Sequence, residues 1–469
     1  MTFSTTIPDP ATDTGFLGHP QGLFICFATE LWERFSFYGM KYLLLLYLTK
    51  YHLFSDANGL EVLGSYAALV YAMPVIGGLL ADRYLGMRKA VVFGGLLLVM
   101  GHLGMAFEGE QARTVDGAVV RDDGALQIFY FSLALIIIGV GFLKPNISTI
   151  VGQLYSKDDP RRDSGFTIFY MGINLGAFSA TLLCGYLGET YGWAYGFGAA
   201  GIGMLFGLAT FIAGQKHLHG HAEPRNPALL KERSPLGVSK ELTIYACGLV
   251  GVVVAWQMLQ FHGAVGFTLN AMSVTVLIGL GWFITTRCNA VERSRMLVLV
   301  VLTMSTVVFW ALFEQSAASM TLFADRVMNR EMLGINFTAA QFGALNSFFI
   351  FLFAPVFAWL WTVLGRRGLE PNTPVKFALG IAQAGLGFGA LVIGAAMPDE
   401  AGLVSAYWMV LAYLLHTTGE LCLSPVGLSA VTKLAVPSVV GVMMGSWFLA
   451  TAYSEFVAVQ LAKIAAVET

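Results

Sequence analysis

Four charged residues interrupt the first long apolar segment of the chain, in the stretch TELWERFSFYGMKY: Glu30, Glu33, Arg34 and Lys41. On a helix, Glu30 and Arg34 stand four positions apart and Tyr38 follows four later, so one face carries these polar groups. Acids and bases at this spacing form ion pairs. Each charge at a membrane centre costs about 2.5 to 3.5 kcal/mol if nothing compensates it. We therefore expect this face to line a water-accessible cavity or to meet opposite charges; the alternative is a purely structural Glu–Arg pair between helices.

A base that suits these acids lies in the stretch GFLKPNIST, where Lys144 falls near the middle of another apolar segment. The following Pro145 loosens the hydrogen-bond ladder of that helix. A buried lysine without a partner tends to lose its proton, whereas a neighbouring carboxylate keeps it charged. We expect Glu33 to be that carboxylate; the alternative is that Lys144 extends its amine to a membrane interface.

Further polar or large aromatic residues lie within later apolar segments: Asn174, Glu314, Asn346, Glu420 and Trp447. An amide in hydrocarbon needs a hydrogen bond or a cavity, so Asn174 predicts a cavity or a bond between helices. The first half of the chain supplies two bases, Arg34 and Lys144. The second half supplies two acids, Glu314 and Glu420. A cavity lined by these groups would be positive on one wall and negative on the other, which suits a zwitterion with separated ends.

The composition indicates the class of protein that holds these residues. Of 469 residues, 56% are hydrophobic and 12% are charged, and the mean hydropathy is +0.69; in a typical soluble domain about a quarter of the residues are charged. Apolar runs of about 20 residues, each able to cross a bilayer as a helix, recur along the chain. The sequence therefore predicts an all-α polytopic membrane protein. Residues 1–33 contain no Lys or Arg for a signal peptide, so we expect the first helix to remain.

Apolar runs between polar breaks predict thirteen helices. They cover residues 22–49, 60–82, 88–107, 126–151, 164–188, 193–214, 241–260, 265–286, 296–325, 339–363, 375–396, 404–432 and 437–465. Lys and Arg gather on the cytoplasmic side of membrane proteins, which tests the count. With the N-terminus inside, eighteen of the 27 Lys and Arg residues fall on the inner side and six on the outer side. We therefore expect a cytoplasmic N-terminus.

A basic polar stretch, QKHLHGHAEPRNPALLKERSPLGVSKE, follows the sixth predicted helix and divides the chain. Six helices, a cytoplasmic linker and further helices are the plan of transporters that hold substrate between two bundles near the midplane. Three histidines of the linker lie in a Pro-rich stretch that contains no Cys, so we expect no metal site there: His217, His219 and His221.

The stretch GGLLADRYLGMRK ends the second predicted helix. Gly77 and Gly78 permit close helix contact. Asp82 and Arg83, with the bases that follow, can bridge neighbouring helix ends on the cytoplasmic side. The ordered spacing resembles the loop signature of the major facilitator superfamily, whose role is conformational control; the alternative is a plain basic turn.

Four more motifs occur in order and together closely resemble the proton-dependent oligopeptide transporter (POT) family: ELWERFSFYG, FLKPN, FYMGINLGAF and GELCLSPVGLS. The similarity extends from Glu30 to about Thr451, nearly the whole chain. It implies the major facilitator fold and proton-coupled symport of di- and tripeptides into the cell by alternating access, in the bacterial inner membrane. The implied partners are peptides, protons and membrane lipid; a monomer, no cofactor, no nucleic acid and no enzymatic activity are expected.

The resemblance also implies roles for individual residues. Proton coupling would rest on Glu30, Glu33, Arg34 and Lys144, with Lys144 as the partner of Glu33. A peptide's carboxyl end would bind Arg34, Tyr38 and Lys144. Its amino end would bind Asn174, Asn346 and Glu420. The remaining assignments are Tyr71 and Trp447 for the cavity lining, Lys41 with Glu314 for an outer gate, and Asp82 with Arg83 for the conformational loop.

The implied parts are a cytoplasmic tail 1–21, a six-helix bundle 22–214, a linker 215–240, an inserted helix pair 241–286 and a C-terminal bundle 287–469. The chain departs from the family at Phe37, where many members have Tyr, and at Phe313, where some have an acid. Gly64 stands where animal relatives have a titrating His, so proton coupling is expected to rest on carboxylates. The last helix of the C-terminal bundle is expected to be missing from this sequence.

Three other readings of the sequence remain open. A related substrate, such as a peptide-like drug, nitrate or another anion, would use the same fold, although Glu420 and Asn174 favour a substrate with an amino group. An intramembrane enzyme would need a nucleophile with a base or a metal set, and the sequence has no HExxH or GxSxG motif. A channel is the third class, and no stretch has the character of a filter loop.

Overall fold

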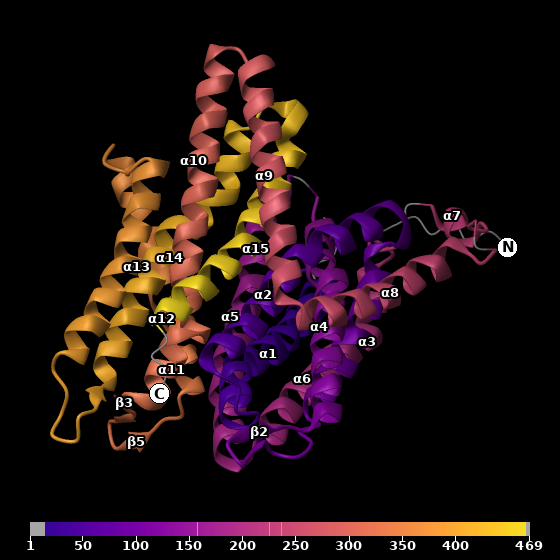
Figure 1. The fold of residues 1–469 in the computed structure, drawn as a ribbon. Coiled ribbons are helices and arrows are strands. Elements are labelled where there is room, and N and C mark those ends of the chain that lie inside the picture. Colours follow the sequence, from indigo (N-terminus) through magenta and orange to yellow (C-terminus); the bar gives the residue numbers. More distant parts are fainter. Residues whose placement is uncertain (1–14, 157, 225, 236, 466–469) are drawn as a thin grey trace. The chain divides into compact units, whose positions relative to one another are not determined.

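The protein is built almost wholly of helices (Figure 1). The computed structural model describes residues 15–156, 158–224, 226–235 and 237–465. Most of the predicted tail and two positions of the predicted linker, 225 and 236, lie outside these ranges. The long helices of the described residues are α1 (Gln21–Lys50), α2 (Asp56–Leu80), α3 (Met87–Met105), α4 (Asp123–Gln153), α5 (Arg162–Tyr191), α6 (Trp193–Gly214), α8 (Lys240–Gln260), α9 (His262–Thr286), α10 (Ala290–Phe313), α12 (Ala344–Arg366), α13 (Thr373–Ala395), α14 (Ala406–Leu434) and α15 (Val440–Ala465).

Short elements connect these helices. The helical turns are η2 (Ala81–Leu85), η3 (Gln215–Leu218), α7 (Pro227–Lys231), η4 (Glu314–Ala317), α11 (Ser319–Arg326), η5 (Ala340–Gly343) and η6 (Pro437–Val439). Three strand pairs lie in the loops: β1 (Arg113–Val115) antiparallel to β2 (Ala118–Val120), β3 (Met328–Asn329) parallel to β6 (Val404–Ser405), and β4 (Glu331–Met332) antiparallel to β5 (Ile335–Asn336). Each pair is too short to form a core.

The long helices match the thirteen predicted ones to within a few residues at most ends. Eleven spans within the described residues are long and apolar enough to cross a membrane. Helices α1 and α14 are not among the eleven; in α1 the four charges described above are the reason. A polypeptide in lipid must satisfy its backbone hydrogen bonds internally, which is why apolar runs of this length become helices.

Several helices begin at a side chain that accepts a hydrogen bond from a backbone N–H group. The Asp122 carboxylate accepts from the Ala125 N–H at 3.0 Å at the start of α4. At the start of α10, Asn289 and Glu292 form a reciprocal capping box, each side chain accepting the other's backbone N–H. These polar residues end the loops and begin the spans, so they help to set where each apolar segment enters the membrane.

The contacts divide the chain into two compact units. The first holds the described residues up to Met40 together with Ala72–Gln260, and the second holds Lys41–Tyr71 with the described residues from Phe261 onward. Helices α1 and α2 are therefore each shared between the units, and α8 and α9 belong to different ones. The domain boundaries predicted from the sequence differ, because they keep each of these four helices within one domain and place α8 and α9 together. Those boundaries remain a proposal.

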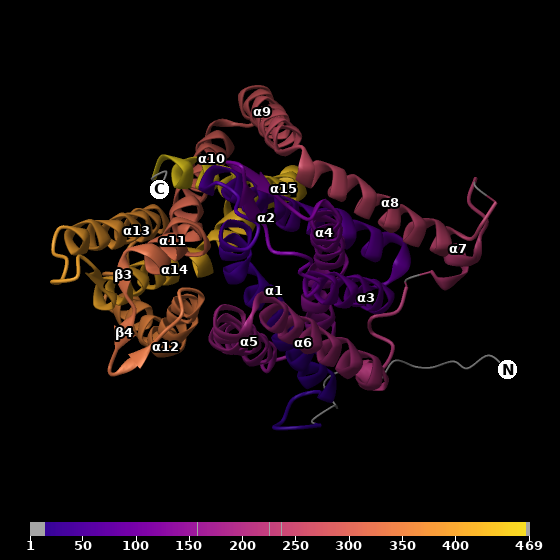
Figure 2. The ribbon, with the colours of Figure 1, turned by 60° about the horizontal axis from the view of Figure 1, so that its bottom comes forward.

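In the first unit, α3 packs against α4 and α6, and α8 runs along α4 (Figure 2). Small residues bring α2 and α4 into backbone contact. A Cβ added to Gly77 would lie 2.0 Å from the Gly141 carbonyl oxygen, whereas a Cβ added to Gly78 would lie 3.4 Å from Pro145 Cβ. The predicted close helix contact is thus confirmed at Gly77. Of the two glycines, Gly77 has no room for a side chain and Gly78 has.

Gly77→Ala is expected to destabilise the first unit by about 1 to 3 kcal/mol, the usual cost of overpacking. The new methyl group would overlap the Gly141 backbone, which cannot turn aside as a side chain can. Gly78→Ala is the matched control, because its methyl group would meet Pro145 at ordinary contact distance. Thermal unfolding of the purified proteins measures the difference; equal melting temperatures for the two variants would contradict the packing argument.

In the second unit, α10 packs against α13 and α15, and α13 lies along α14 (Figure 2). A core of buried apolar side chains from these helices includes Phe309, Phe377, Leu423 and Trp447. Helix α9 contacts α15, where Gly266 leaves space for the Phe456 ring. The helices that carry the acids of the second half are therefore held by an apolar core of their own.

The predicted continuous helix 296–325 is wrong in one respect, because the structure breaks it at η4. Ala318 has φ −115° and ψ −106°, which is outside the helical region. Side chains compensate the broken ladder: Gln315 Nε2 donates to the carbonyls of Ala311 at 3.1 Å and Ala458 at 2.8 Å, and Thr321 Oγ1 donates to the Ser316 carbonyl at 2.7 Å. The break begins at Glu314, one of the predicted functional residues.

Candidate functional site

Arg34 on α1 is held by two buried carboxylates of the same helix. Its Nε and a terminal nitrogen donate to the two oxygens of Glu33. Its Nε also lies 3.5 Å from Glu30 Oε1. All three side chains are at most 3% exposed. These three residues carry one positive and two negative charges when every group is ionised, and Lys144 adds a second positive charge that acts on Glu30.

Glu30 differs from Glu33 in how completely it is bonded. Within the described part of the chain, the buried Glu30 Oε2 has no hydrogen-bond partner, whereas both oxygens of Glu33 accept from Arg34. Lys144 on α4 is partly buried and its charge acts on Glu30. The predicted pairing of Lys144 with Glu33 stays a prediction, and the bonding here makes Glu30 the acid with free capacity.

Two aromatic rings of α1 cover the guanidinium group. The Arg34 Cζ atom lies 4.7 Å from the ring centroid of Phe37 and 5.9 Å from that of Tyr38. Both distances fall within the range of cation–π attraction. Phe37, where the resemblance to the family implies Tyr in many members, therefore contacts Arg34 through its ring face, although it has no hydroxyl group.

Helix α5 approaches this cluster closely. A Cβ added to Gly176 would lie 2.2 Å from the Leu31 carbonyl oxygen and 3.1 Å from Arg34 Cβ. Asn174, on the same helix, is buried and donates from Nδ2 to the Tyr170 carbonyl at 3.1 Å. That bond is within one helix, so Asn174 is bonded in this structure without reaching a second helix through it.

In the second unit, Asn346 and Glu420 form the second polar group. Asn346 Nδ2, from α12, donates to Glu420 Oε2 on α14 at 3.0 Å and to Thr417 Oγ1 at 3.1 Å. Glu420 is 9% exposed, so its carboxylate is almost entirely out of water. The structure thus brings together two of the three residues predicted to bind an amino group. Thr417 was not predicted.

The two predicted lining residues of the second unit have different surroundings. Trp447 is buried, and its ring lies edge-on to Phe377 at 6.4 Å and over Gly427, where an added Cβ would lie 2.4 Å from the indole. Tyr71 is partly buried, and its ring centroid lies 5.9 Å from Lys41 Nζ. Trp447 therefore packs in the core of its unit, while Tyr71 contacts a charge.

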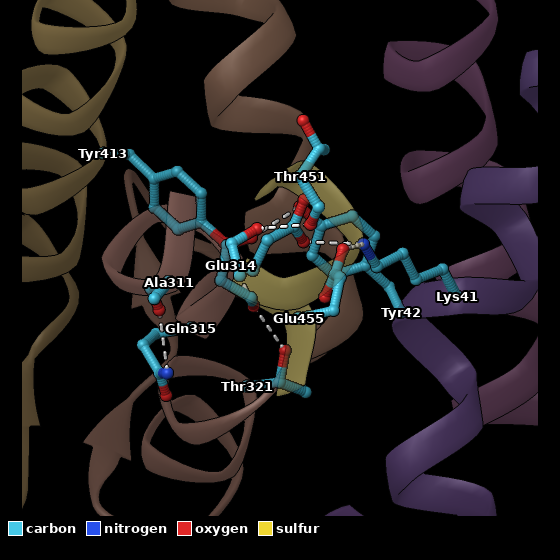
Figure 3. A network of polar contacts seen from close by, with 11 residues as sticks. Lys41, Tyr42, Ala311, Glu314, Gln315, Thr321, Tyr413, Thr451 and Glu455 are labelled. Atoms are coloured by element: carbon cyan, nitrogen blue, oxygen red, sulfur yellow. Dashed lines mark hydrogen bonds and ion pairs between the residues drawn. The ribbon is translucent and has the colours of Figure 1, made fainter. Parts of the chain in front are cut away.

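Lys41, the residue of α1 at which the second unit begins, reaches toward two carboxylates of the same unit (Figure 3). Its Nζ lies 2.6 Å from Glu314 Oε2 and 3.7 Å from Glu455 Oε1 on α15. The predicted contact between Lys41 and Glu314 is present. Glu455 is a residue that the sequence reasoning missed, although the signal existed: it is an acid inside an apolar segment, the same feature that drew attention to Glu30.

The predicted conformational loop lies at η2, where Asp82 and Arg83 are exposed. The bases that follow it bridge to neighbouring segments. Arg88 binds Glu223 through its guanidinium group, and Lys89 Nζ lies 2.6 Å from Glu241 Oε1 at the start of α8. The expectation that bases of this stretch join neighbouring helix ends is confirmed for Lys89. Glu223, the partner of Arg88, lies in the loop between η3 and α7.

The described residues contain no group of three or more His, Cys, Asp or Glu side chains that could hold a metal ion. The polar clusters above combine acids with Arg, Lys, Asn and Thr. Such clusters bind charged ligands and protons through hydrogen bonds and ion pairs.

A family model decides the identity of the chain, because the POT family model matches residues 88–469. The protein belongs to the POT family. The uncharacterized transporter YclF of Bacillus subtilis (strain 168) is 40% identical over 96% of this chain and 88% of that protein. The di-/tripeptide transporter of Lactococcus lactis subsp. lactis (strain IL1403) is 34% identical, and the match covers 96% of this chain and 90% of that transporter.

Solved POT structures share the fold. A mutant of the peptide transporter POT in complex with alafosfalin has a TM-score of 0.80 and 38% sequence identity, and the match covers 97% of this chain and 91% of that one. The predicted family and the predicted all-α polytopic fold of major facilitator type are confirmed. With its eleven candidate spans, this POT family member is a multi-pass membrane protein. The family is one of transporters, which supports the expectation that the protein is not an enzyme.

Proposed function

We propose that this POT family protein carries out proton-coupled symport of di- and tripeptides into the cell by alternating access. The observation that carries the proposal is the buried cluster in which Arg34 is held by Glu33 and Glu30. The cluster offers a cation for a peptide carboxylate and an acid for a proton at the same place. The Lactococcus lactis relative, named a di-/tripeptide transporter, supports the substrate class.

Proton binding at Glu30 would release Arg34 for the peptide. Glu30 has a buried oxygen with free hydrogen-bonding capacity within the described residues, and it lies near both Arg34 and the charge of Lys144. A proton on this carboxyl removes its negative charge, which weakens its attraction for the two bases. The peptide carboxylate then replaces it, and loss of the proton on the inner side restores the ion pairs and expels the peptide.

The two ends of the peptide would bind different residues. The carboxyl end binds Arg34, Tyr38 and Lys144, and the amino end binds Asn174, Asn346 and Glu420. The hydrogen bond from Asn346 to Glu420 supports this assignment, because it orients a buried carboxylate that can accept a charged amine. Tyr71 and Trp447 would line the cavity. Lys41 with Glu314 would form an outer gate, and Asp82 with Arg83 would take part in the conformational change.

The remaining proposals concern the setting of the protein. The excess of Lys and Arg on one side supports a cytoplasmic N-terminus. The bacterial relatives support a place in the bacterial plasma membrane, which is the inner membrane in bacteria that have two. We further propose that the transporter functions as a monomer, with protons as the only energy source and no cofactor.

Peptide-like compounds are the second substrate class. The solved relative in complex with alafosfalin supports this alternative. A ligand of this class would use the same amine- and anion-binding residues. Competition of labelled dialanine uptake by tripeptides, free amino acids, peptide-like drugs and nitrate separates the classes, since only ligands that fit the site reduce uptake.

Uptake of labelled dialanine into proteoliposomes under an inward proton gradient tests the proposed function. We expect accumulation inside the vesicles that stops when a protonophore collapses the gradient. An absence of dialanine uptake by folded protein, with or without the gradient, would contradict peptide transport. Uptake that does not depend on the proton gradient would contradict proton coupling and leave peptide transport supported.

A further inference from the structure

Lys41 has two buried acids beside it, and each acid comes from a different segment of the second unit. Glu314 lies at the break that begins η4, and Glu455 lies in the middle of α15. Their nearest oxygens are 2.6 and 3.7 Å from Lys41 Nζ. The side chains of Lys41, Glu314 and Glu455 are 4%, 11% and 6% exposed, so water covers little of the group.

The charges of this group do not balance when every member is ionised. One ammonium and two carboxylates leave a net negative charge in a place that water scarcely reaches. A buried unpaired charge is costly, and two carboxylates that share one site take up a proton so that only one stays ionised. The two acids also act electrostatically on each other. A single proton would make the group neutral while Lys41 keeps one full ion pair.

Among the residues that the structure describes, the groups acting on Lys41 and Glu455 include no second base that would balance the charge. Three tyrosines face the cluster and are neutral near pH 7: Tyr42 on α1, Tyr71 on α2 and Tyr413 on α14. Glu420 on α14 is a further acid whose charge interacts with that of Glu314, so it adds no positive charge. Lys41 is the base whose charge acts on Glu455 among the described residues. Helix α2 packs directly on α15 here, since a Cβ at Gly64 would lie 2.1 Å from Val459 Cγ2. This close packing leaves no room for a further charged side chain at that position.

We propose that Glu314 and Glu455 form a carboxylate pair that shares one proton beside Lys41, which makes Glu455 a second proton-binding group of the transporter. The inference rests on the proposed symport. A proton from the outer aqueous side adds to a carboxylate oxygen of the pair and leaves Lys41 with one carboxylate and one neutral carboxyl. Loss of that proton restores the net negative charge, which is tolerated only when water enters. The protonated pair therefore stabilises the contact of α1 with α15, and deprotonation favours its opening.

Two measurements on the full chain test the pair. Infrared difference spectra between high and low pH show a band for each carboxyl that gains a proton. The pH dependence of dialanine exchange at equal pH on both sides reports the transport cycle without a driving gradient. The variants are Glu455→Gln and Glu314→Gln, and the control is Glu61→Gln, an acid on α2 that binds Lys463 of α15 outside the cluster.

We expect one carboxyl band of the wild type to be lost in Glu455→Gln and in Glu314→Gln and kept in Glu61→Gln, because the proton belongs to the pair. The pH of half-maximal exchange should fall by about one unit in Glu455→Gln. In this variant Glu314 still pairs with Lys41, and the negative charge of Glu455 that favoured its protonation is gone. If one variant does not fold, the other still tests the band. An unchanged band and an unchanged pH profile in the folded variants would overturn the pair. Wild-type protein that takes up no peptide would instead count against the proposed function, and the infrared result would stand separately.

Discussion

Glu30→Gln is expected to abolish accumulation of a dipeptide against its gradient while exchange of the dipeptide across the membrane continues. The amide is permanently neutral, as the protonated acid is, and it leaves the bonds between Arg34 and Glu33 in place. An inward gradient of about one pH unit supplies about 1.4 kcal/mol per coupled proton, enough for roughly tenfold accumulation. Proteoliposomes with the variant should reach only equal concentrations on both sides.

Glu33→Gln is the matched comparison, because it changes the same chemical group one helical turn away. It removes the carboxylate that holds Arg34 through both oxygens and leaves a buried guanidinium with a weaker partner. Breaking a buried pair in this way costs about 3 to 5 kcal/mol. We expect exchange as well as accumulation to be lost, together with a lower melting temperature. Normal accumulation in Glu30→Gln would show that another group carries the coupled proton.

Glu420→Gln is expected to weaken the binding of peptides with a free amino end by about 10- to 100-fold, the value of a hydrogen bond to a charged group. The carboxylate is buried and already oriented by Asn346, so little else compensates its charge. Inhibition constants for dialanine and for its N-acetylated form measure the effect. The acetylated peptide has no ammonium group, and its affinity should be nearly the same in variant and wild type.

Thr417→Val controls for the orientation of the amide. Thr417 accepts the second hydrogen bond of Asn346, at 3.1 Å, and carries no charge. Its loss removes a neutral hydrogen bond worth about 1 kcal/mol, so we expect a change of about fivefold. If Glu420→Gln weakened both peptides equally, the carboxylate would have a structural role and no direct part in binding the amine.

The class of the protein and its helices could be predicted from the sequence because membranes constrain local structure strongly. Apolar runs near 20 residues become helices wherever they occur, since lipid offers no partners for a free backbone. The polar face of α1 followed from helical spacing alone, as did the expectation that its charges need partners. The close approach at Gly77 was likewise predictable, because small residues mark helix contacts in membranes.

Individual partners could not be predicted in the same way. The sequence predicted Lys144 as the partner of Glu33, because a buried lysine needs a neighbouring carboxylate to stay charged and the resemblance to the family implied the same pair. In the structure the long side chain of Arg34 turns back to bind Glu33 through both oxygens. The break at Glu314 was also invisible in the sequence, because the residues around Ala318 are ordinary helix formers.

The sequence by itself determined that this is a helical membrane transporter of the POT family and that the charges of α1 are buried. Only the tertiary structure decided that Glu33 accepts hydrogen bonds through both oxygens, that α10 ends at Glu314, and that Glu455 lies beside Lys41 and Glu314. The physical reason is the range of the interactions. Backbone hydrogen bonds and hydrophobic runs are local in the chain, whereas an ion pair depends on distances of a few ångströms between segments that are, for Lys41 and Glu455, more than four hundred residues apart.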